Sequence, residues 1–197
     1  MQCAVEAARG GAAVTLIEKE GDTGGKLRNW NKLFPTFTPA DEVLSALRHR
    51  LAREENITVK TDCEVSAITS RKVATASGEE LACDAVVIAT GFALFDARVK
   101  EEYGYGIYDN VVTSADLERM FNDGAVKLKS GGAPRRIAIL HCVGSRDEKV
   151  CQRHCSKVCC VTGVKQAMEL KKLFPSADVF NFYMDIRMFG PGYEEMY

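Results

Sequence analysis

The sequence predicts an α/β fold in which parallel strands and helices alternate in two layered units. Apolar runs at 12–20, 83–91 and 135–142 have the length and composition of buried strands. They alternate with segments of helical periodicity at 40–55 and 157–173. The composition, 46% hydrophobic and 27% charged residues, is that of a globular chain with a real core.

Local patterns define the elements of the first half. Residues 2–9 carry an apolar stripe of alanines and Val5, which predicts a helix that Gly10-Gly11 ends. The strand at 12–20 then leads into the glycine-rich turn GDTGG at 21–25. The helix at 40–55 follows, with apolar residues recurring at helical spacing. These residues are Val43, Leu44, Leu47 and Leu51.

After this helix, 57–61 is predicted to be a strand, and alternating segments at 64–68 and 72–76 predict a small antiparallel excursion closed at SGEE. The run CDAVVIATG at 83–91 is predicted to be a second buried strand of the first unit. A variable stretch at 92–134 marks the break between the two units.

The second half contains another strand, helix and strand. The run RRIAILHC predicts a buried strand at 135–142, and 177–186 predicts a final strand. Between them, the helix at 157–173 places four apolar side chains on one face. These are Val161, Val164, Met168 and Leu173.

Bulk properties exclude several classes of function. A net charge of −1 over 197 residues gives no electrostatic reason to expect nucleic acid or an anionic membrane as partner. No apolar run reaches the length of about 18 residues that a membrane span needs. The N-terminus lacks the pattern of a secretory signal, so a cytoplasmic location is predicted. In that reducing compartment, the eight cysteines are better interpreted as metal ligands or redox groups than as disulfides.

The first unit contains half of a dinucleotide-binding pattern. Glu18 ends a strand that follows a helix, where such folds place an acid that bonds a ribose hydroxyl. A solvated acid at a strand end would give the same pattern. Gly24-Gly25 allow close backbone approach, and Thr90-Gly91 end a predicted parallel strand, where ligands bind in open α/β sheets. The usual first strand and its G-x-G-x-x-G turn are not found ahead of residues 2–9.

The second unit carries thiols where a nucleotide turn is expected. Cys142 follows the strand, and Cys155 and Cys159 are four apart, so they share a face if the helix begins there. Cys160 is adjacent. Four thiolates converging from a strand end and a helix start can hold a [4Fe–4S] cluster. A structural Zn²⁺ ion or spare buried thiols are the alternatives, but the paired C-x-x-C units of zinc sites are missing, and the spacing favours iron–sulfur.

Several nearby residues have open interpretations. Only Gly144 is left of a phosphate-binding turn, so a pyridine nucleotide is not expected to bind in the usual way. Cys151 is a fifth candidate ligand or a free thiol. Cys3, Cys63 and Cys83 are expected to be small buried hydrophobes. Four basic residues form either a solvated face or a charge that offsets the thiolates and guides an acidic partner. They are Arg146, Lys149, Arg153 and Lys157.

The segments VTLIEKEGDTGGKL, CEVSAI and CDAVVIATGF resemble the FAD-binding domain of flavoproteins with two dinucleotide-binding domains, such as thioredoxin reductase. The resemblance implies two Rossmann-like units, both incomplete here, because that family has a strand and a glycine-rich turn ahead of MQCAVEAARGG. We therefore expect the chain to be a fragment or to start late. The implied FAD-binding residues are Glu18, Lys19, Gly24, Gly25, Val65, Ala89, Thr90 and Gly91.

The segments CVGSRD, CSKVCC, VKQAMEL and DIRMFGPGYEEMY resemble the A subunit of heterodisulfide reductase and related subunits of quinone-modifying oxidoreductases. This resemblance implies a [4Fe–4S] cluster and a domain plan. Residues 1–92 would be a partial FAD-binding domain, 93–134 a connecting segment returning toward it, and 135–197 a partial second domain with the cluster. The implied cluster ligands are Cys142, Cys155, Cys159 and Cys160.

The expected function is that of an electron-transfer flavoprotein subunit that passes electrons between FAD and the cluster. The resemblance implies iron–sulfur subunits of a heterodisulfide reductase-like or quinone-modifying complex as partners, and it leaves electron bifurcation open. No nucleophile–base pair stands out, so no catalytic side chain is predicted. The alternatives are a thioredoxin reductase-like dithiol oxidoreductase, which lacks its C-x-x-C here, and a non-catalytic, zinc-stapled interaction module.

Overall fold

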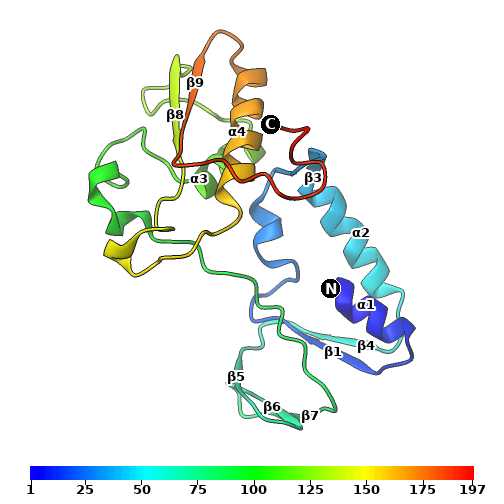
Figure 1. Ribbon diagram of the computed structural model, residues 1–197. Helices are drawn as coiled ribbons and strands as arrows, with labels where there is room; N and C mark the ends of the chain where they lie inside the picture. The colour runs from blue at the N-terminus through cyan, green and yellow to red at the C-terminus, as the bar shows by residue number, and fades with distance from the viewer. The chain divides into compact units, whose positions relative to one another are not determined.

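The computed structural model describes residues 1–197, which divide into two compact units. Unit 1 comprises Met1–Arg28 and Ala40–Phe92; unit 2 comprises Asn29–Pro39 and Ala93–Tyr197 (Figure 1). Residues 29–39 belong to unit 2, although nothing in the sequence indicates this. The roles assigned to 1–92, 93–134 and 135–197 remain predictions.

Unit 1 is built on a parallel strand pair with helices packed against it. Strands β1 and β4 pair in parallel, with Val14 opposite Ile57, and α1 contacts both strands and α2 (Figure 1). The core of this unit is small, and Val5 is its fully buried member. The elements are α1 (Gln2–Arg9), β1 (Val14–Ile17), the 3₁₀ helix η1 (Gly25–Asn29), which leads out of unit 1, α2 (Ala40–Ala52) and β4 (Ile57–Lys60).

The helices of unit 1 lie where the apolar periodicity predicts them. Gly10 follows the last residue of α1, and its amide donates to the Glu6 carbonyl (3.1 Å). In α2, Leu44 and Leu51 are buried, and the other two residues of the predicted stripe, Val43 and Leu47, are half-buried. The stripe therefore packs on the core through Leu44 and Leu51 and is partly open at Val43 and Leu47.

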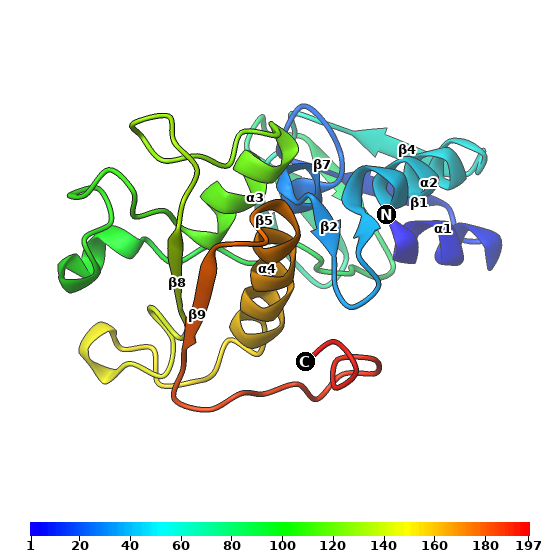
Figure 2. The ribbon, with the colours of Figure 1, turned by 90° about the horizontal axis from the view of Figure 1, so that it is seen from above.

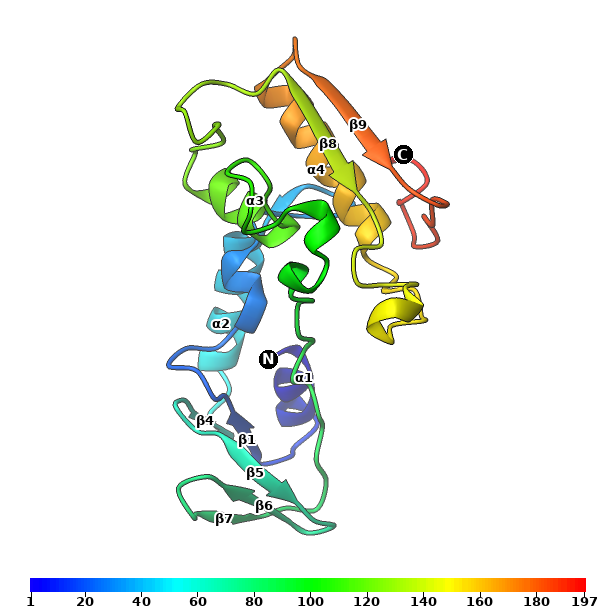
Figure 3. The same cartoon turned by 90° about the vertical axis from the view of Figure 1, so that its left-hand side faces the viewer.

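The antiparallel excursion is confirmed and has one more strand than predicted. Strands β5 (Val65–Ile68), β6 (Lys72–Thr75) and β7 (Glu80–Ala82) form a sheet in that order (Figure 3). The buried Thr75 hydroxyl accepts from the Glu79 amide (3.1 Å) and closes the turn between β6 and β7.

The predicted buried strand at 83–91 is wrong. The segment has no regular secondary structure, and Val87 and Ile88 are 67% and 71% exposed. A strand needs a neighbour for its backbone N–H and C=O groups. The parallel sheet of unit 1 contains only β1 and β4, and neither pairs with this run. The apolar composition alone is not enough to make a strand.

Unit 2 is built around a β-α-β arrangement. Strands β8 (Arg136–Leu140) and β9 (Asp178–Phe182) pair in parallel, and α4 (Cys159–Leu173) connects them and packs on one face (Figures 2 and 3). The predicted strands are therefore confirmed, but each is covered on one side only. Leu140, Phe180 and Phe182 on the other face are about half exposed.

The helix α4 begins two residues later than predicted. Val161 and Val164 are buried and Met168 is half-buried, as its apolar face predicts, but Leu173 is 55% exposed. None of the helices in the chain combines the length and the apolarity needed to cross a bilayer. The other elements of unit 2 are β2 (Lys32–Leu33), β3 (Thr38–Pro39), η2 (Ala97–Val99), η3 (Glu101–Tyr103), α3 (Ser114–Asn122) and η4 (Glu148–Val150).

A buried ionic network fastens α3 to α4. Lys165 is 1% exposed, and its Nζ lies 2.6 and 2.7 Å from the two carboxylate oxygens of Glu118 and 2.8 Å from Glu169. Gln166 Nε2 donates to Glu118 (2.8 Å), and the Asn31 amide donates to the same carboxylate (3.0 Å). A charge this deeply buried is tolerated because it is paired and hydrogen-bonded.

The helix α3, which the sequence analysis missed, begins with a capping box. The Thr113 hydroxyl accepts from the Asp116 amide (3.1 Å), and the Asp116 carboxylate accepts from the Thr113 amide (2.9 Å). Burial alone would raise the pKa of Asp116. Hydrogen bonds from the Thr113 hydroxyl and amide, and from Tyr105, outweigh burial and hold this pKa below its usual value.

We expect Asp116→Asn to lower the free energy of unfolding by about 1 kcal/mol at pH 7, because an amide replaces the charged partner of Thr113 in the capping box. A depressed folded-state pKa gives stability that is present above the unfolded-state pKa, about 3.9, and is lost as the pH falls through the folded-state pKa. The two proteins should therefore become equally stable in acid. Urea unfolding at pH 7 and pH 3 measures this, with Asp123→Asn at the exposed C-terminal end of α3 as the control. A stability difference that is the same at both pH values contradicts it.

Candidate functional site

Unit 2 brings the four predicted cluster cysteines into one region. Cys142 lies two residues beyond β8, and Cys159 and Cys160 are the first two residues of α4. The sulfur of Cys142 is 3.8 Å from that of Cys159, and the sulfur of Cys160 is 3.7 Å from the Asp185 carbonyl oxygen. Cys160 is buried, and the other three are half-buried.

Cys155 does not share a helix face with Cys159, so that expectation is wrong. The helix begins only at Cys159, with Val158 as its N-cap, and Cys155 lies in the preceding loop. Its sulfur accepts from the Lys157 amide (3.3 Å). Cys155 is nevertheless close enough for its charge to contribute to the raised pKa of Cys160. The path of the loop, rather than helical periodicity, therefore brings Cys155 near Cys160.

The loop at 143–158 is held in an unusual backbone conformation. Four residues from 142 to 157 that are not glycine have φ between +56° and +62°, a region that costs energy for residues with a Cβ. The buried Ser145 hydroxyl donates to the His154 carbonyl (3.0 Å) and accepts from the Ser156 amide (2.9 Å). The four residues are Cys142, Arg146, Cys151 and Lys157.

A buried lysine that the sequence analysis missed anchors the same loop. Lys100 is 5% exposed, and its Nζ lies 2.7 Å from Asp147 and 2.7 Å from Glu102. Asp147 also accepts from the Lys149 amide (2.9 Å) and thereby starts η4. Because 100 and 147 are far apart in sequence, no local pattern could have indicated this pair.

The thiols have very different acidities. The neighbouring His141 ring is the largest influence on Cys159, and it lowers the pKa of that thiol to about 6 against the opposing effect of burial. Burial, with the neighbouring Cys159 charge, raises the pKa of Cys142 to about 11, and burial also raises the pKa of Cys160. Cys159 is therefore the most acidic of these three thiols, and the thiolate is the form that binds metals.

His141 is a site residue that the sequence analysis missed. Its Nε2 lies 2.9 Å from Asn181 Oδ1 on β9, and its Nδ1 is buried with no hydrogen-bond partner. Gly163 on α4 leaves space for the ring, since a Cβ there would lie 2.6 Å from it. The one available signal was the position of this histidine directly before Cys142 at the end of a predicted strand.

The predicted basic residues are only partly arranged around the thiols. Arg146 is paired with Asp185 (2.5 Å), and its charge favours the Cys142 thiolate. Arg187, which was not predicted, lies near Cys155 and Cys160, whose charges contribute to its raised pKa after the larger effect of Asp185. Lys149, Arg153 and Lys157 are exposed, as expected for a solvated face.

The remaining cysteines differ from the expectation of small buried hydrophobes. Cys3 is exposed, because it lies on the solvent side of α1, and Cys63 and Cys83 are half-buried. Cys151, the fifth candidate, is exposed and follows η4.

The donor set fits a Cys₄ metal centre in number and chemistry. Four sulfurs come from one strand end, one loop and one helix start, and Arg146 supplies positive charge beside them. The first turn of α4 has no side-chain cap, so its backbone N–H groups also favour negative charge there. The assignment of all four cysteines as cluster ligands remains a prediction.

The predicted FAD-binding residues all belong to unit 1, and Glu18 directly follows the parallel strand β1. The Glu18 amide donates to the Lys60 carbonyl (2.8 Å), and the Glu18 carbonyl accepts from the Cys63 amide (3.0 Å), so β1 and β4 end together. Glu18 is half-buried, Lys19 is exposed and Val65 on β5 is exposed. Ala89, Thr90 and Gly91 are exposed and lie outside regular secondary structure.

Contacts of neighbouring residues bring the glycine-rich turn and residue 91 together. Lys26 Nζ lies 5.2 Å from the ring centroid of Phe92, so Gly25 and Gly91 are on nearby segments. Both glycines have positive φ, and a Cβ at either would meet nothing within 4 Å. This open backbone suits close approach of a ligand. Gly24 is different, because a Cβ there would lie 2.6 Å from Leu44.

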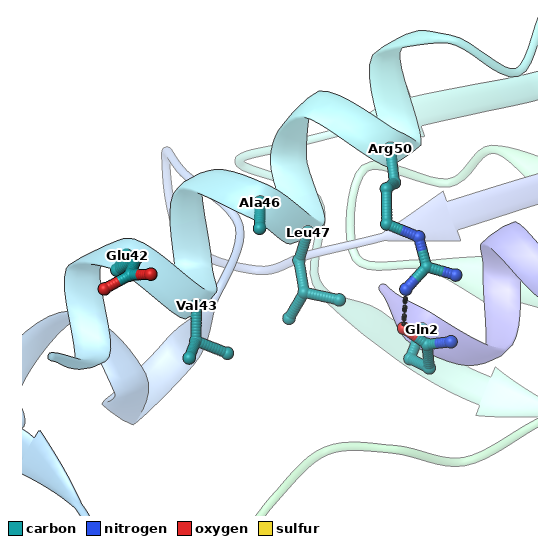
Figure 4. A pocket seen from close by; sticks show the side chains of 6 residues that line it. All are labelled: Gln2, Glu42, Val43, Ala46, Leu47 and Arg50. Atoms are coloured by element: carbon teal, nitrogen blue, oxygen red, sulfur yellow. Dashed lines mark hydrogen bonds between the residues drawn. The ribbon is translucent and has the colours of Figure 1, made fainter. Parts of the chain in front are cut away.

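The turn itself is fixed by an arginine that the sequence analysis missed. Arg48 on α2 donates to Asp22 (2.5 Å) and to the Thr23 carbonyl (2.7 Å). A separate shallow pocket on unit 1 lies where Arg50 donates to Gln2 (2.7 Å) (Figure 4). None of the predicted site residues lines it. The lining residues are Gln2, Glu42, Val43, Ala46, Leu47 and Arg50.

Comparison with known families places the first 140 residues of the chain. Residues 1–140 match the family described as pyridine nucleotide-disulphide oxidoreductase. The chain belongs to this family. The match ends two residues before Cys142, so the cysteine loop of this family member lies outside the region that defines the family.

Curated relatives of this family member are A subunits of heterodisulfide reductases. It is 49% identical over 118 residues to the A subunit of an H₂/formate:CoB-CoM heterodisulfide,ferredoxin reductase from Methanococcus maripaludis. It is 47% identical over 118 residues to the iron-sulfur A subunit of the CoB–CoM heterodisulfide reductase from Methanocaldococcus jannaschii. Each alignment covers 57% of this chain and 18% of the relative, so the chain spans under a fifth of the length of these relatives.

A solved structure of L-proline dehydrogenase from P. horikoshii superimposes with a TM-score of 0.46 at 16% identity, covering 95% of this chain and 34% of that chain. Family membership confirms the predicted fold class, an α/β fold of dinucleotide-binding type. The relatives confirm the resemblance to the A subunit of heterodisulfide reductase.

Proposed function

We propose that this chain is part of an electron-transfer flavoprotein subunit of a heterodisulfide reductase-like complex. It binds FAD through unit 1 and a [4Fe–4S] cluster through Cys142, Cys155, Cys159 and Cys160 of unit 2. The observation that carries the proposal is the gathering of four cysteines between the end of β8 and the start of α4.

The surroundings of the thiols support this role. FAD, when bound, accepts electrons in pairs and releases them singly, and a cluster takes them one at a time. Arg146 offsets thiolate charge, and the neighbouring His141 ring lowers the pKa of Cys159. In unit 1, Gly25 and Gly91 offer open backbone, and Glu18 stands at the strand end where a ribose hydroxyl is bonded. The proposal includes partner iron–sulfur subunits of such a complex, because the relatives are named as A subunits of heterodisulfide reductases.

The test is iron and sulfide analysis after anaerobic reconstitution of the full chain. We expect about four iron and four sulfide per chain, with a broad visible absorption. Cys155→Ser and Cys159→Ser should each lose most of both. Cys151→Ser is the matched control, because Cys151 is an exposed thiol of the same loop, and it should keep both. A colourless wild-type chain, or loss in the Cys151 variant equal to that in the others, would overturn the ligand assignment.

A further inference from the structure

His141, Cys159 and Cys160, between the end of β8 and the start of α4, form a group that could hold a single metal ion. A ring nitrogen of His141 and the sulfurs of Cys159 and Cys160 all lie within 4.8 Å of one another. Cys142 joins them through its 3.8 Å contact with Cys159. Two thiolates bound tetrahedrally to one Zn²⁺ at about 2.3 Å stand about 3.8 Å apart. Thiolates of a cube bind four different iron atoms and are held farther apart.

His141 is arranged as metal-binding histidines usually are. With Asn181 Oδ1 accepting from Nε2–H, the lone pair is on Nδ1. That nitrogen is buried and has no hydrogen-bond partner. Histidine ligands generally donate their other ring N–H to an oxygen acceptor, which fixes the ring and the tautomer. The absence of a side chain at Gly163 leaves room for the ring beside α4.

We propose that this site also binds one divalent ion of borderline softness, such as Zn²⁺, through Cys142, Cys159, Cys160 and His141. This is the Cys₃His set of structural zinc sites. Three metal–sulfur bonds and one metal–nitrogen bond form, and each ligand cysteine that is a thiol gives its proton to solvent. Cys155 is not a ligand in this mode.

The single ion and the proposed cluster exclude each other, because they share three cysteines. Each has one ligand of its own: His141 for the ion and Cys155 for the cluster. The inference concerns the same site as the proposed function but does not require the cluster to form. Variants of His141 and Cys155, the two ligands that are not shared, therefore separate the two proposals.

The experiment titrates the full chain, purified without iron or sulfide, with Co²⁺ and then with Zn²⁺ as competitor. We expect one ion per chain and the intense visible bands of tetrahedral thiolate cobalt. His141→Ala should weaken binding more than about tenfold. His154→Ala, an exposed histidine beside Cys155, is the matched control and should bind as the wild type does. Cys155→Ser should bind the ion normally and fail to form the cluster.

X-ray absorption of the zinc-loaded wild type gives a readout that needs no variant, with three sulfurs and one nitrogen expected. Four sulfurs, or an affinity of His141→Ala within about twofold of the wild type, overturns the inference. Circular dichroism of each variant shows whether a variant that does not bind the ion is still folded. If His141→Ala unfolds, His141→Gln takes its place. If the wild type binds zinc normally but takes up no iron on reconstitution, the cluster proposal is overturned and the zinc proposal is retained.

Discussion

Replacing Lys165 by methionine is expected to lower the free energy of unfolding by about 3–5 kcal/mol, because it leaves two buried carboxylates without their shared cation. Glu118 and Glu169 are 3% and 5% exposed, so water cannot take the place of the ammonium group. Glu169 retains only Lys32, at 3.5 Å. Urea unfolding followed by circular dichroism measures the loss.

Two further variants separate lost charge pairing from lost packing. Lys172→Met, on the same helix, removes an exposed ammonium group that lies 4.9 Å from the Phe37 ring, and it should cost less than about 1 kcal/mol. Lys165→Met combined with Glu118→Gln should be more stable than Lys165→Met alone, because it removes one of the orphaned charges. If Lys165→Met lowered the free energy of unfolding by less than about 1 kcal/mol, the ionic network would make no appreciable contribution to stability.

Replacing Gly144 by alanine should destabilise unit 2 by about 2–5 kcal/mol and prevent the cysteine loop from retaining a metal centre. Gly144 has φ of +70°, which costs about 1–2 kcal/mol for a residue with a Cβ. A Cβ there would also collide with the Phe95 ring, and such overpacking costs about 1–3 kcal/mol. Thermal unfolding and iron content after reconstitution measure the two effects.

Gly131→Ala is the matched control, since Gly131 also has positive φ in unit 2 but a Cβ there meets nothing within 4 Å. Gly131→Ala should lose only the stability that positive φ costs a residue with a Cβ. Adding Phe95→Ala to Gly144→Ala should restore part of the iron content by removing the clash. If Gly131→Ala and Gly144→Ala lose equal stability, contact with Phe95 has no role.

The parts of the fold that could be predicted are those in which local periodicity and long-range packing agree. The helix α2 shows this, because the apolar stripe that predicts it is also the side that packs. The capping box of α3 can be recognised in the sequence, since Thr113 is followed three residues later by Asp116, and this pattern predicts a helix start. It was overlooked because the surrounding stretch, rich in glycine, looked irregular. The run at 83–91 misled because strand formation depends on a neighbour that sequence pattern does not reveal.

The candidate site divides in the same way. The cysteines could be found because their identity and spacing carry the chemistry, whereas His141 could not, because its role depends on Asn181, 40 residues along the chain, and on the space at Gly163. Lys165 was equally hidden: a lysine on a helix is normally expected to face water. Only its contacts with Glu118 and Glu169 explain its burial.

The hydrogen bonds of Ser145 and the ion pair between Lys100 and Asp147 have a consequence for affinity. They order the segment 143–158 when unit 2 folds, so the conformational entropy of bringing Cys142 beside Cys159 is lost at that stage. An incoming thiophilic ion then meets a preorganised set of donors and bears little of that ordering cost.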